Sequence, residues 1–112
     1  MTEIPETQYR SWIQKSLNRI ETCFEDVDPD VIECEQQFGA LTLKLPTGAR
    51  TILSAQPSVR QLWLAMASKG VAYHFNYDVA KEQWLDDKGL GIELFACLRS
   101  FLKETTGQDF GL

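Results

Sequence analysis

The sequence predicts an α+β fold, a two-layer sandwich in which two terminal α-helices pack on one face of a five- to six-stranded antiparallel sheet. Two patterns carry this prediction: apolar residues recur every three or four positions near both ends of the chain, and they alternate with polar residues in short runs between. With 112 residues, 44% of them hydrophobic, the chain has the length and apolar content of a single domain, residues 1–112, with one packed core.

The first helix is expected over residues 9–27, where apolar residues spaced by three and four positions form one buried stripe. Pro5 suits the opening turn of a helix. Asp28-Pro29 is expected to end it, because proline disfavours helical geometry in the residue before it and has no N–H to donate. The stripe consists of Tyr9, Ile13, Leu17, Ile20, Phe24 and Val27.

Short runs of residues then alternate between apolar and polar, as in the strands of a half-buried sheet. The clearest run is Leu41-Thr42-Leu43-Lys44-Leu45, in which the three leucines point to one side and Thr42 and Lys44 to the other. Turn residues between successive runs, such as Pro46-Thr47-Gly48, predict an antiparallel meander. The expected strands are residues 31–35, 41–45, 50–54, 61–65, 71–77 and 83–85.

A second amphipathic helix is expected from residue 91 to about residue 105. The two helices then cover one face of the sheet, and the other face stays open to solvent. Its buried face comprises Leu94, Phe95, Leu98, Phe101 and Leu102, with Arg99, Lys103 and Glu104 on the solvent side.

An acidic segment is the most informative feature for function. Seven carboxylates lie within residues 21–35, which contain no lysine or arginine, so this segment carries −7 while the whole chain carries −5. Unpaired like charges raise the self-repulsion of a folded domain, and Glu25 and Asp26 are expected in the last helical turn, where the helix dipole is negative. The segment therefore predicts a surface that binds metal ions or a basic protein. Its carboxylates are Glu21, Glu25, Asp26, Asp28, Asp30, Glu33 and Glu35.

Carboxylate oxygens without a nearby thiolate or imidazole suit hard cations and hold them weakly, because water stays in the coordination shell. The segment is not an EF-hand: a loop opening at Asp26 would have Val31 at the glycine position and Gln37 at the glutamate position. The alternative interpretation is a solvated acidic face that only aids solubility.

The open face of the sheet is expected to carry a second candidate surface, for a protein partner. If the leucines of residues 61–65 face the helices, Gln61 and Trp63 face outward, and the same alternation places Lys44 and His74 outward. A tryptophan on a polar sheet face is a typical anchor for a protein partner. The alternatives are a register shifted by one residue, which would reverse every side chain, and an ordinary surface position for His74.

Composition and motifs exclude several function classes. The pI of about 4.8 argues against binding to nucleic acid or to an anionic membrane surface. The sequence also contains no run of eighteen apolar residues, the length needed to span a bilayer. The sequence contains no nucleophile elbow, P-loop or Ser/His/Asp set, and Gly89-Leu90-Gly91 lacks the third glycine of a dinucleotide loop. We therefore expect neither an enzyme nor an organic cofactor.

The N-terminus has no apolar signal segment and no arginine-rich presequence. Cys23, Cys34 and Cys97 lack the short spacings of a zinc site and are interpreted as reduced thiols. Together these features predict a cytoplasmic protein; the alternative is the mature form of a processed protein.

The order of these features resembles the frataxin family, in particular its bacterial CyaY members, over roughly residues 9–105. The resemblance rests on Phe24-Glu25-Asp26 at the end of the first helix, on Ile32-Glu33-Cys34-Glu35, and most specifically on Gln61-Leu62-Trp63-Leu64-Ala65 with Gln56 before it. Two positions depart from the family pattern. Ser54 stands where asparagine is usual, and Pro57 follows Gln56 directly instead of one position later.

The resemblance implies an acidic iron-binding protein that docks on the cysteine desulfurase and modulates iron–sulfur cluster assembly, as an iron donor or an iron sensor. It implies weakly held ferrous or ferric iron on the seven carboxylates, and partners that include the desulfurase and the iron–sulfur scaffold protein. The chain would be a monomer, or an oligomer formed with metal. Ferroxidase activity, discussed for some relatives, leaves no signature in sequence. The alternative is an acidic protein-interaction module that holds no metal. The partner-binding residues, expected from the alternation on the open sheet face, are Gln61, Trp63, Lys44 and His74.

Overall fold

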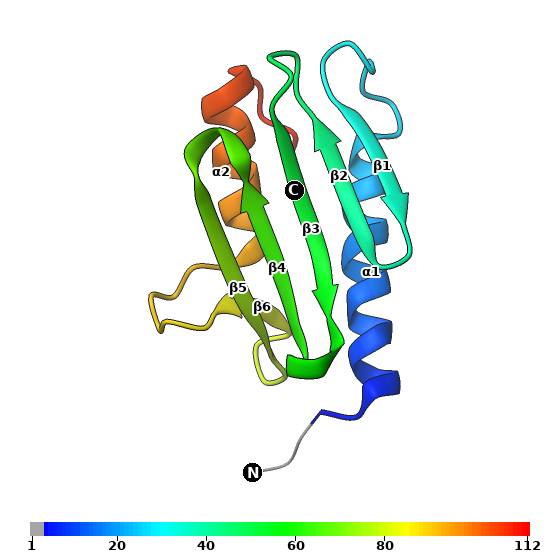
Figure 1. Cartoon of the computed structure of the whole chain (residues 1–112), viewed down its shortest axis with the longest axis vertical. Coiled ribbons are helices and arrows are strands. Elements are labelled where there is room, and N and C mark those ends of the chain that lie inside the picture. The colour runs from blue at the N-terminus through cyan, green and yellow to red at the C-terminus, as the bar shows by residue number, and fades with distance from the viewer. Residues whose placement is uncertain (1–3) are drawn as a thin grey trace.

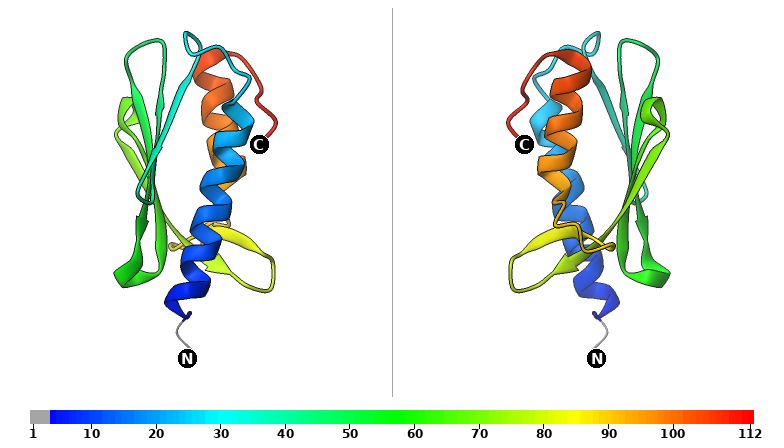
Figure 2. Two further views of the ribbon diagram at one scale, coloured as in Figure 1. Left: turned by 90° about the vertical axis from the view of Figure 1, so that its right-hand side faces the viewer. Right: turned by 90° about the vertical axis from the view of Figure 1, so that its left-hand side faces the viewer.

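Over residues 4–112, which the computed structural model describes, the chain forms a six-stranded sheet with two helices on one of its faces (Figures 1 and 2). The predicted fold class is confirmed: every pair of neighbouring strands is antiparallel, and the strands follow one another in chain order. The elements are α1 (Glu6–Phe24), β1 (Glu33–Gln37), β2 (Ala40–Lys44), β3 (Arg50–Gln56), β4 (Gln61–Met66), β5 (Val71–Asp78), β6 (Gln83–Asp86) and α2 (Leu94–Thr106), with short 3₁₀ helices at Pro57–Val59 and Ala67–Lys69.

The hydrophobic core lies between the two layers, and the apolar side chains that the alternation assigned to the inner face of the sheet contribute to it. The leucines of β2 and β4 are buried beneath the helices, as is the inner face of α2. Trp84 of β6 is the largest fully buried side chain among the described residues. Its ring packs edge-on against Tyr9 and Tyr77, and its Nε1 donates a hydrogen bond to Ser16 Oγ at 2.8 Å. Trp84 therefore joins the start of α1 to the last strand.

α1 ends at Phe24, three residues earlier than predicted. The N–H groups of Glu25 and Val27 donate to carbonyl oxygens three residues back, at Thr22 and Phe24, which tightens the chain out of the helix. Glu25 is the C-cap and Asp26 lies in the turn that follows. The prediction that both lie in the last helical turn was wrong, although both remain at the negative end of the helix dipole.

α2 begins at Leu94, three residues later than predicted, because Glu93 caps it. The Glu93 carboxylate accepts hydrogen bonds from the backbone N–H groups of Phe95 and Ala96, at 2.8 and 3.0 Å. Phe95, which was expected in the buried face, is half-buried, and the Arg19 guanidinium lies 3.9 Å from its ring centre. Neither helix of the described chain combines the length and the apolar character needed to cross a membrane.

Every observed strand overlaps its predicted range. β1 lies two residues later than predicted, yet the predicted orientation holds: Ile32 and Cys34 turn toward the core, while Glu33 and Glu35 are exposed. Phe75 of β5 is buried and Asn76 is exposed, so the inward and outward assignment of β5 is also confirmed. The acidic segment and the open sheet face can therefore be placed from these elements.

Candidate functional site

The acidic segment runs from the end of α1, through the connection that follows, into β1 at one edge of the sheet (Figure 1). Of the seven predicted carboxylate residues, Glu21 is half-buried and the other six are exposed. All seven predicted carboxylates thus lie along one stretch of surface. We call this set the acidic surface: Glu21, Glu25, Asp26, Asp28, Asp30, Glu33 and Glu35.

The connection between α1 and β1 is shaped by its own hydrogen bonds. Asp28 Oδ1 accepts a bond from the Asp30 N–H at 2.9 Å. The Asp28 carbonyl oxygen accepts bonds from the N–H groups of Val31 and Ile32, at 2.8 and 3.1 Å. Because these bonds close a defined turn, they fix the backbone that carries the exposed carboxylates of the connection.

The Glu21 side chain points toward β1. Its Oε2 accepts a hydrogen bond from Gln36 Nε2 at 3.1 Å, and Gln36 Oε1 accepts one from Gln14 Nε2 at 2.8 Å. These bonds join α1 to β1 through side chains. They fix the distance between the helical and the strand carboxylates of the acidic surface.

Within residues 4–112, only one carboxylate of the acidic surface forms an ion pair. Glu35 lies 3.4 Å from the Lys44 ammonium on the neighbouring strand; the Glu35 side chain is exposed and that of Lys44 is partly exposed. An exposed pair of this kind contributes about 0–1 kcal/mol. The last turn of α1 also carries no basic residue. The domain's own lysines and arginines therefore leave most of the acidic surface uncompensated.

A groove of about 310 Å³ runs between the end of α1 and β1. Glu21, Glu25 and Glu33 lie on its walls, together with apolar side chains and Cys34. Burial, followed by the charge of Glu21, raises the pKa of the Cys34 thiol to about 11. At neutral pH the thiol is protonated, so the groove offers carboxylate oxygens rather than a thiolate.

Within the part of the chain that the structure describes, no three His, Cys, Asp or Glu side chains come together as a ready-made metal site. The carboxylates are instead spread along the surface. One or two of them, with water completing the coordination shell, could hold a hard cation weakly. This arrangement fits a transiently held ion and not a tightly bound structural metal.

Three of the four residues predicted for partner binding meet on the open sheet face. Trp63 and His74 stand opposite each other on β4 and β5, and their rings stack with centroids 4.2 Å apart. Gln61 Oε1 accepts a hydrogen bond from Trp63 Nε1 at 2.8 Å, and Gln61 Nε2 donates to Asp87 Oδ2 at 3.2 Å. The predicted outward orientation of Trp63 is therefore confirmed.

Asp87 lies beside Gln61, Trp63 and His74 and was not identified from the sequence. We call these four residues the Trp63 group. Its Oδ2 lies 3.6 Å from His74 Nδ1, and its N–H donates to the His74 carbonyl oxygen at 2.8 Å. The sequence shows an acidic turn after the last strand. It contains no signal that this turn folds back beside β5.

Lys44 also lies on the open face but apart from the Trp63 group. Trp63 stands opposite Ser54, and Ser54 opposite Ala40, so Lys44 is two strands away and four residues further along. At about 4.8 Å per strand and 3.3 Å per residue, this separation is about 16 Å. Through its ion pair with Glu35, Lys44 adjoins the acidic surface instead.

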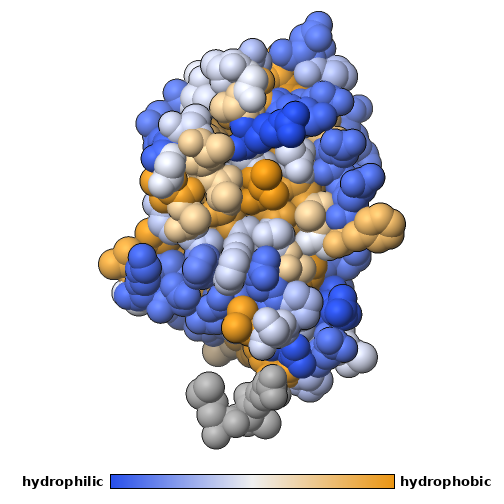
Figure 3. Space-filling model, viewed as in Figure 1, coloured by the Kyte–Doolittle hydropathy of each residue, from blue (hydrophilic) through white to orange (hydrophobic). Residues whose placement is uncertain are grey.

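An apolar patch lies at the centre of the open face, with hydrophilic surface around it (Figure 3). Ile52, Ala65 and Ala72 stand opposite one another on β3, β4 and β5, and all three are exposed. The Trp63–His74 stack lies two residues along from this row. A flat apolar area with a polar rim is typical of a surface that binds another protein.

Comparison with known proteins relates the chain to one family. The family model for the frataxin-like domain matches residues 2–108. A curated relative from Pseudomonas fluorescens, named iron–sulfur cluster assembly protein CyaY, is 35% identical over 107 residues, which are 96% of this chain and 94% of the relative. A protein of the same name from Azotobacter vinelandii is 38% identical over 106 residues, covering 95% and 93% of the two chains.

Solved structures show the same fold. Frataxin from Psychromonas ingrahamii superposes with a TM-score of 0.83 at 21% identity, over 97% of this chain and all of the other. Trimeric frataxin from Saccharomyces cerevisiae, complexed with ferrous iron, superposes with a TM-score of 0.67 at 23% identity, over 96% and 91% of the two chains.

Proposed function

Because the chain belongs to the frataxin-like family, we propose that it binds iron weakly on its acidic surface and docks there on the cysteine desulfurase. Docking would modulate iron–sulfur cluster assembly, with the chain acting in the cytoplasm as iron donor or iron sensor. The observation that supports this most is the acidic surface itself, of which only Glu35 has an ion pair within residues 4–112.

Iron is the cargo in this proposal and not a resident cofactor. Glu21, Glu25 and Glu33 line the groove between α1 and β1, where a ferrous ion would meet oxygens of one or two of them and keep most of its water shell. Weak, partly hydrated binding allows the ion to leave, which a donor or a sensor requires.

The same negative charges would attract a basic patch of the desulfurase and orient the two proteins for docking. Clustered surface charge accelerates the encounter with an oppositely charged patch and disfavours wrong partners. Because the carboxylates are exposed, salt screens this attraction over about 8 to 10 Å at physiological ionic strength. Affinity for the desulfurase should therefore fall as salt rises.

The Trp63 group would contribute to docking on the open sheet face that adjoins the acidic surface. The ring is held against His74 and by Gln61, so it is pre-organised, and the apolar row of Ile52, Ala65 and Ala72 extends the surface that a partner could cover. Pre-organised aromatic side chains are the usual centres of binding energy at interfaces.

Replacing the half-buried ring tests this role: Trp63→Ala should weaken retention by the assembly proteins by about 2 kcal/mol, or roughly thirtyfold. The measurement is a pull-down of the chain with purified desulfurase and scaffold, with and without ferrous iron. Val79→Ala is the control, because Val79 is an exposed apolar residue on the turn between β5 and β6.

The wild-type chain should be retained in low salt, and Val79→Ala should behave like it. If Trp63→Ala is retained as well as the wild-type chain, the open face does not contribute to partner binding. No retention of the wild-type chain at low salt would contradict docking altogether.

A protein-interaction module without physiological metal is the second candidate. It is favoured by the finding that no three metal-ligating side chains come together within residues 4–112. The two candidates share the docking surface and differ only in iron binding, so a direct iron titration separates them.

A further inference from the structure

Half of β5 lies at an unpaired edge of the sheet. β6 pairs with residues 75–78 of β5 and leaves residues 71–74 without a strand partner on that side. One bond reaches this part of the edge, from the Asp87 N–H to the His74 carbonyl oxygen at 2.8 Å.

That bond fixes the direction of the neighbouring backbone groups. In an antiparallel ladder, alternate residues direct their N–H and C=O groups to the same edge. Because the His74 carbonyl points away from β4, the His74 N–H and both backbone groups of Ala72 point away from β4 as well. They present a donor, an acceptor and a donor in the order that pairs with an extended peptide backbone.

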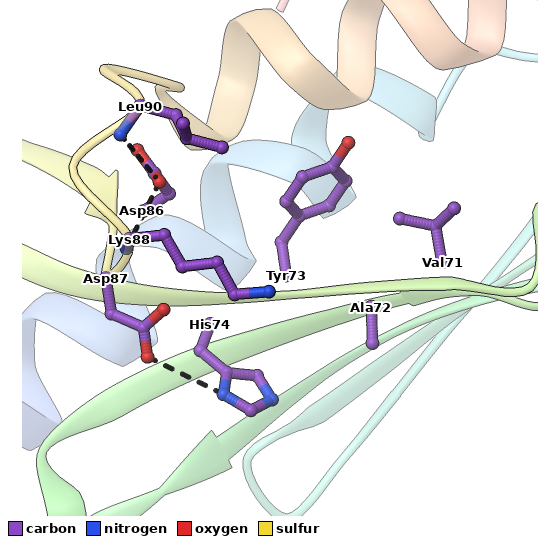
Figure 4. Close-up of a pocket in the computed structure, with 8 residues that line it drawn as sticks. All are labelled: Val71, Ala72, Tyr73, His74, Asp86, Asp87, Lys88 and Leu90. Carbon is purple, nitrogen blue, oxygen red and sulfur yellow. Dashed lines mark hydrogen bonds and ion pairs between the residues drawn. The ribbon is translucent and has the colours of Figure 1, made fainter.

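A hollow of about 170 Å³ lies beside this edge (Figure 4). Tyr73 of β5 and Leu90 of the turn after β6 line it and provide apolar surface. Leu90 is 67% exposed, which leaves most of its side chain available for contact. An incoming strand with an apolar residue on the helix side of the sheet would cover both.

The turn that forms the far wall of this hollow is already fixed. The Asp86 carboxylate accepts hydrogen bonds from the N–H groups of Lys88, Leu90 and Ile92, at 3.2, 3.0 and 2.9 Å. Desolvation raises the pKa of Asp86, but these backbone bonds outweigh it, and the pKa is lowered below its usual value. A ligand would therefore meet a pre-formed wall and would not have to order it.

Lys88 is the charged side chain of the hollow that an incoming ligand would meet. Asp86 and Asp87 keep their negative charges, but the Asp86 carboxylate is directed to the backbone of its own turn and that of Asp87 to His74 and Gln61. Lys88, by contrast, has no ion pair in the described residues. Figure 4 shows the Lys88 side chain extended alongside β5. A lysine at a strand edge disfavours pairing with a second copy of the chain, which would bring a second Lys88 to the same edge.

We propose that residues 71–74 of β5 bind an extended acidic peptide segment of a partner protein, which adds a strand to the sheet. Its backbone pairs with Ala72 and His74, an apolar side chain covers Tyr73 and Leu90, and a carboxylate reaches Lys88. This site is distinct from the acidic surface, because β1 and β5 lie toward opposite sides of the sheet.

The probe is the synthetic peptide acetyl-Thr-Val-Thr-Val-Glu-amide, titrated into the ¹⁵N-labelled full chain and followed by NMR. We expect saturable chemical-shift changes at residues 71–74 and 88–90. Ala72→Pro removes the outward N–H and leaves the bonds to β4 intact, since proline is tolerated on an edge strand with its nitrogen facing solvent. This variant should bind the peptide at least about tenfold more weakly, through loss of a main-chain hydrogen bond and steric block of the edge.

Lys88→Glu should weaken binding by about threefold or more, because an attraction becomes a repulsion. It leaves the backbone ladder untouched and keeps the test decisive if the proline variant folds poorly. Lys81→Glu makes the same change of net charge on the turn between β5 and β6 and should bind like the wild type. No shifts at residues 71–74, shifts at the β1 edge instead, or full binding by both Ala72→Pro and Lys88→Glu would overturn the proposal.

Discussion

The variant Glu25→Lys, Asp26→Lys and Asp30→Lys should bind the cysteine desulfurase at least about tenfold more weakly than the wild type. Each reversal removes an attraction and adds a repulsion of about 0.2–1 kcal/mol at an exposed site, and 1.4 kcal/mol corresponds to tenfold in affinity. These three carboxylates are exposed and, in the described structure, accept no side-chain hydrogen bond. Glu21 and Asp28 are left unchanged because their carboxylates do accept such bonds.

The loss of binding should come with a gain in stability, which separates it from unfolding. Glu25 and Asp26 lie at the C-terminal end of α1, where a positive charge is favoured by about 0.3–1 kcal/mol. Urea denaturation should therefore show an equal or higher free energy of unfolding for the variant.

The matched control is Glu6→Lys, Glu82→Lys and Glu104→Lys, which also changes the net charge from −5 to +1 by three replacements of −1 with +1. Glu6 and Glu104 take part only in exposed ion pairs, with Arg10 and Lys69. Isothermal calorimetry should give this control an affinity near that of the wild type. If both variants lose affinity equally, the effect is due to net charge and not to the acidic surface. If the first variant binds as tightly as the wild type, the acidic surface does not steer the desulfurase.

Trp84→Ala should lower the free energy of unfolding by about 3–5 kcal/mol, a large part of the 5–15 kcal/mol typical of such a domain. The ring is 1% exposed, contacts Tyr9 and Tyr77 edge-on, and donates to Ser16. Its removal opens a cavity between the start of α1 and the last strand, where no other side chain can fill the space without moving both layers.

Trp84→Phe should cost less, because it keeps most of the apolar volume and loses only the indole bond. Ser16 Oγ would still donate to the Trp12 carbonyl oxygen at 2.8 Å, so its hydroxyl would not be left unpaired. Gln83→Ala, at the exposed neighbouring position, is the control and should change stability by less than about 0.5 kcal/mol. Urea denaturation measures all three, and a loss below 1 kcal/mol for Trp84→Ala would contradict this account of the core.

The strands of the sheet could be predicted from the sequence because the alternation that specifies them lies within short runs of neighbouring residues. The alternation of Leu41, Leu43 and Leu45 with Thr42 and Lys44 has a period of two, which assigns each side chain to a face. The orientation of Trp63 followed from the same rule applied to β4. Turn residues between the runs then made an antiparallel meander the simplest topology.

The helix ends could not be predicted to the residue. Pro29 limits how far a helix can extend, but α1 stops at Phe24, where N–H groups bond to carbonyls three residues back. The start of α2 depends on the Glu93 side chain turning back to cap the helix, whereas the apolar spacing alone placed the start at residue 91.

The acidic surface was visible in the sequence because its members are neighbours in the chain. The orientation of Glu21 was not, because it depends on Gln36, fifteen positions later and on another element. The separation of Lys44 from Trp63 and the contact of Asp87 with His74 also depend on strand register and on the path of a turn. Residues brought together across elements therefore required the structure.

The central claim is that an uncompensated acidic surface holds iron and a basic partner at the same place. Titration of ferrous iron into the ¹⁵N-labelled chain without oxygen, followed by paramagnetic line broadening, tests it most directly. We predict weak, saturable broadening confined to residues 21–35 and their contacts, and its loss in the variant Glu25→Lys, Asp26→Lys and Asp30→Lys. Broadening that is absent, that spreads evenly over all exposed carboxylates, or that persists in this variant would contradict the account.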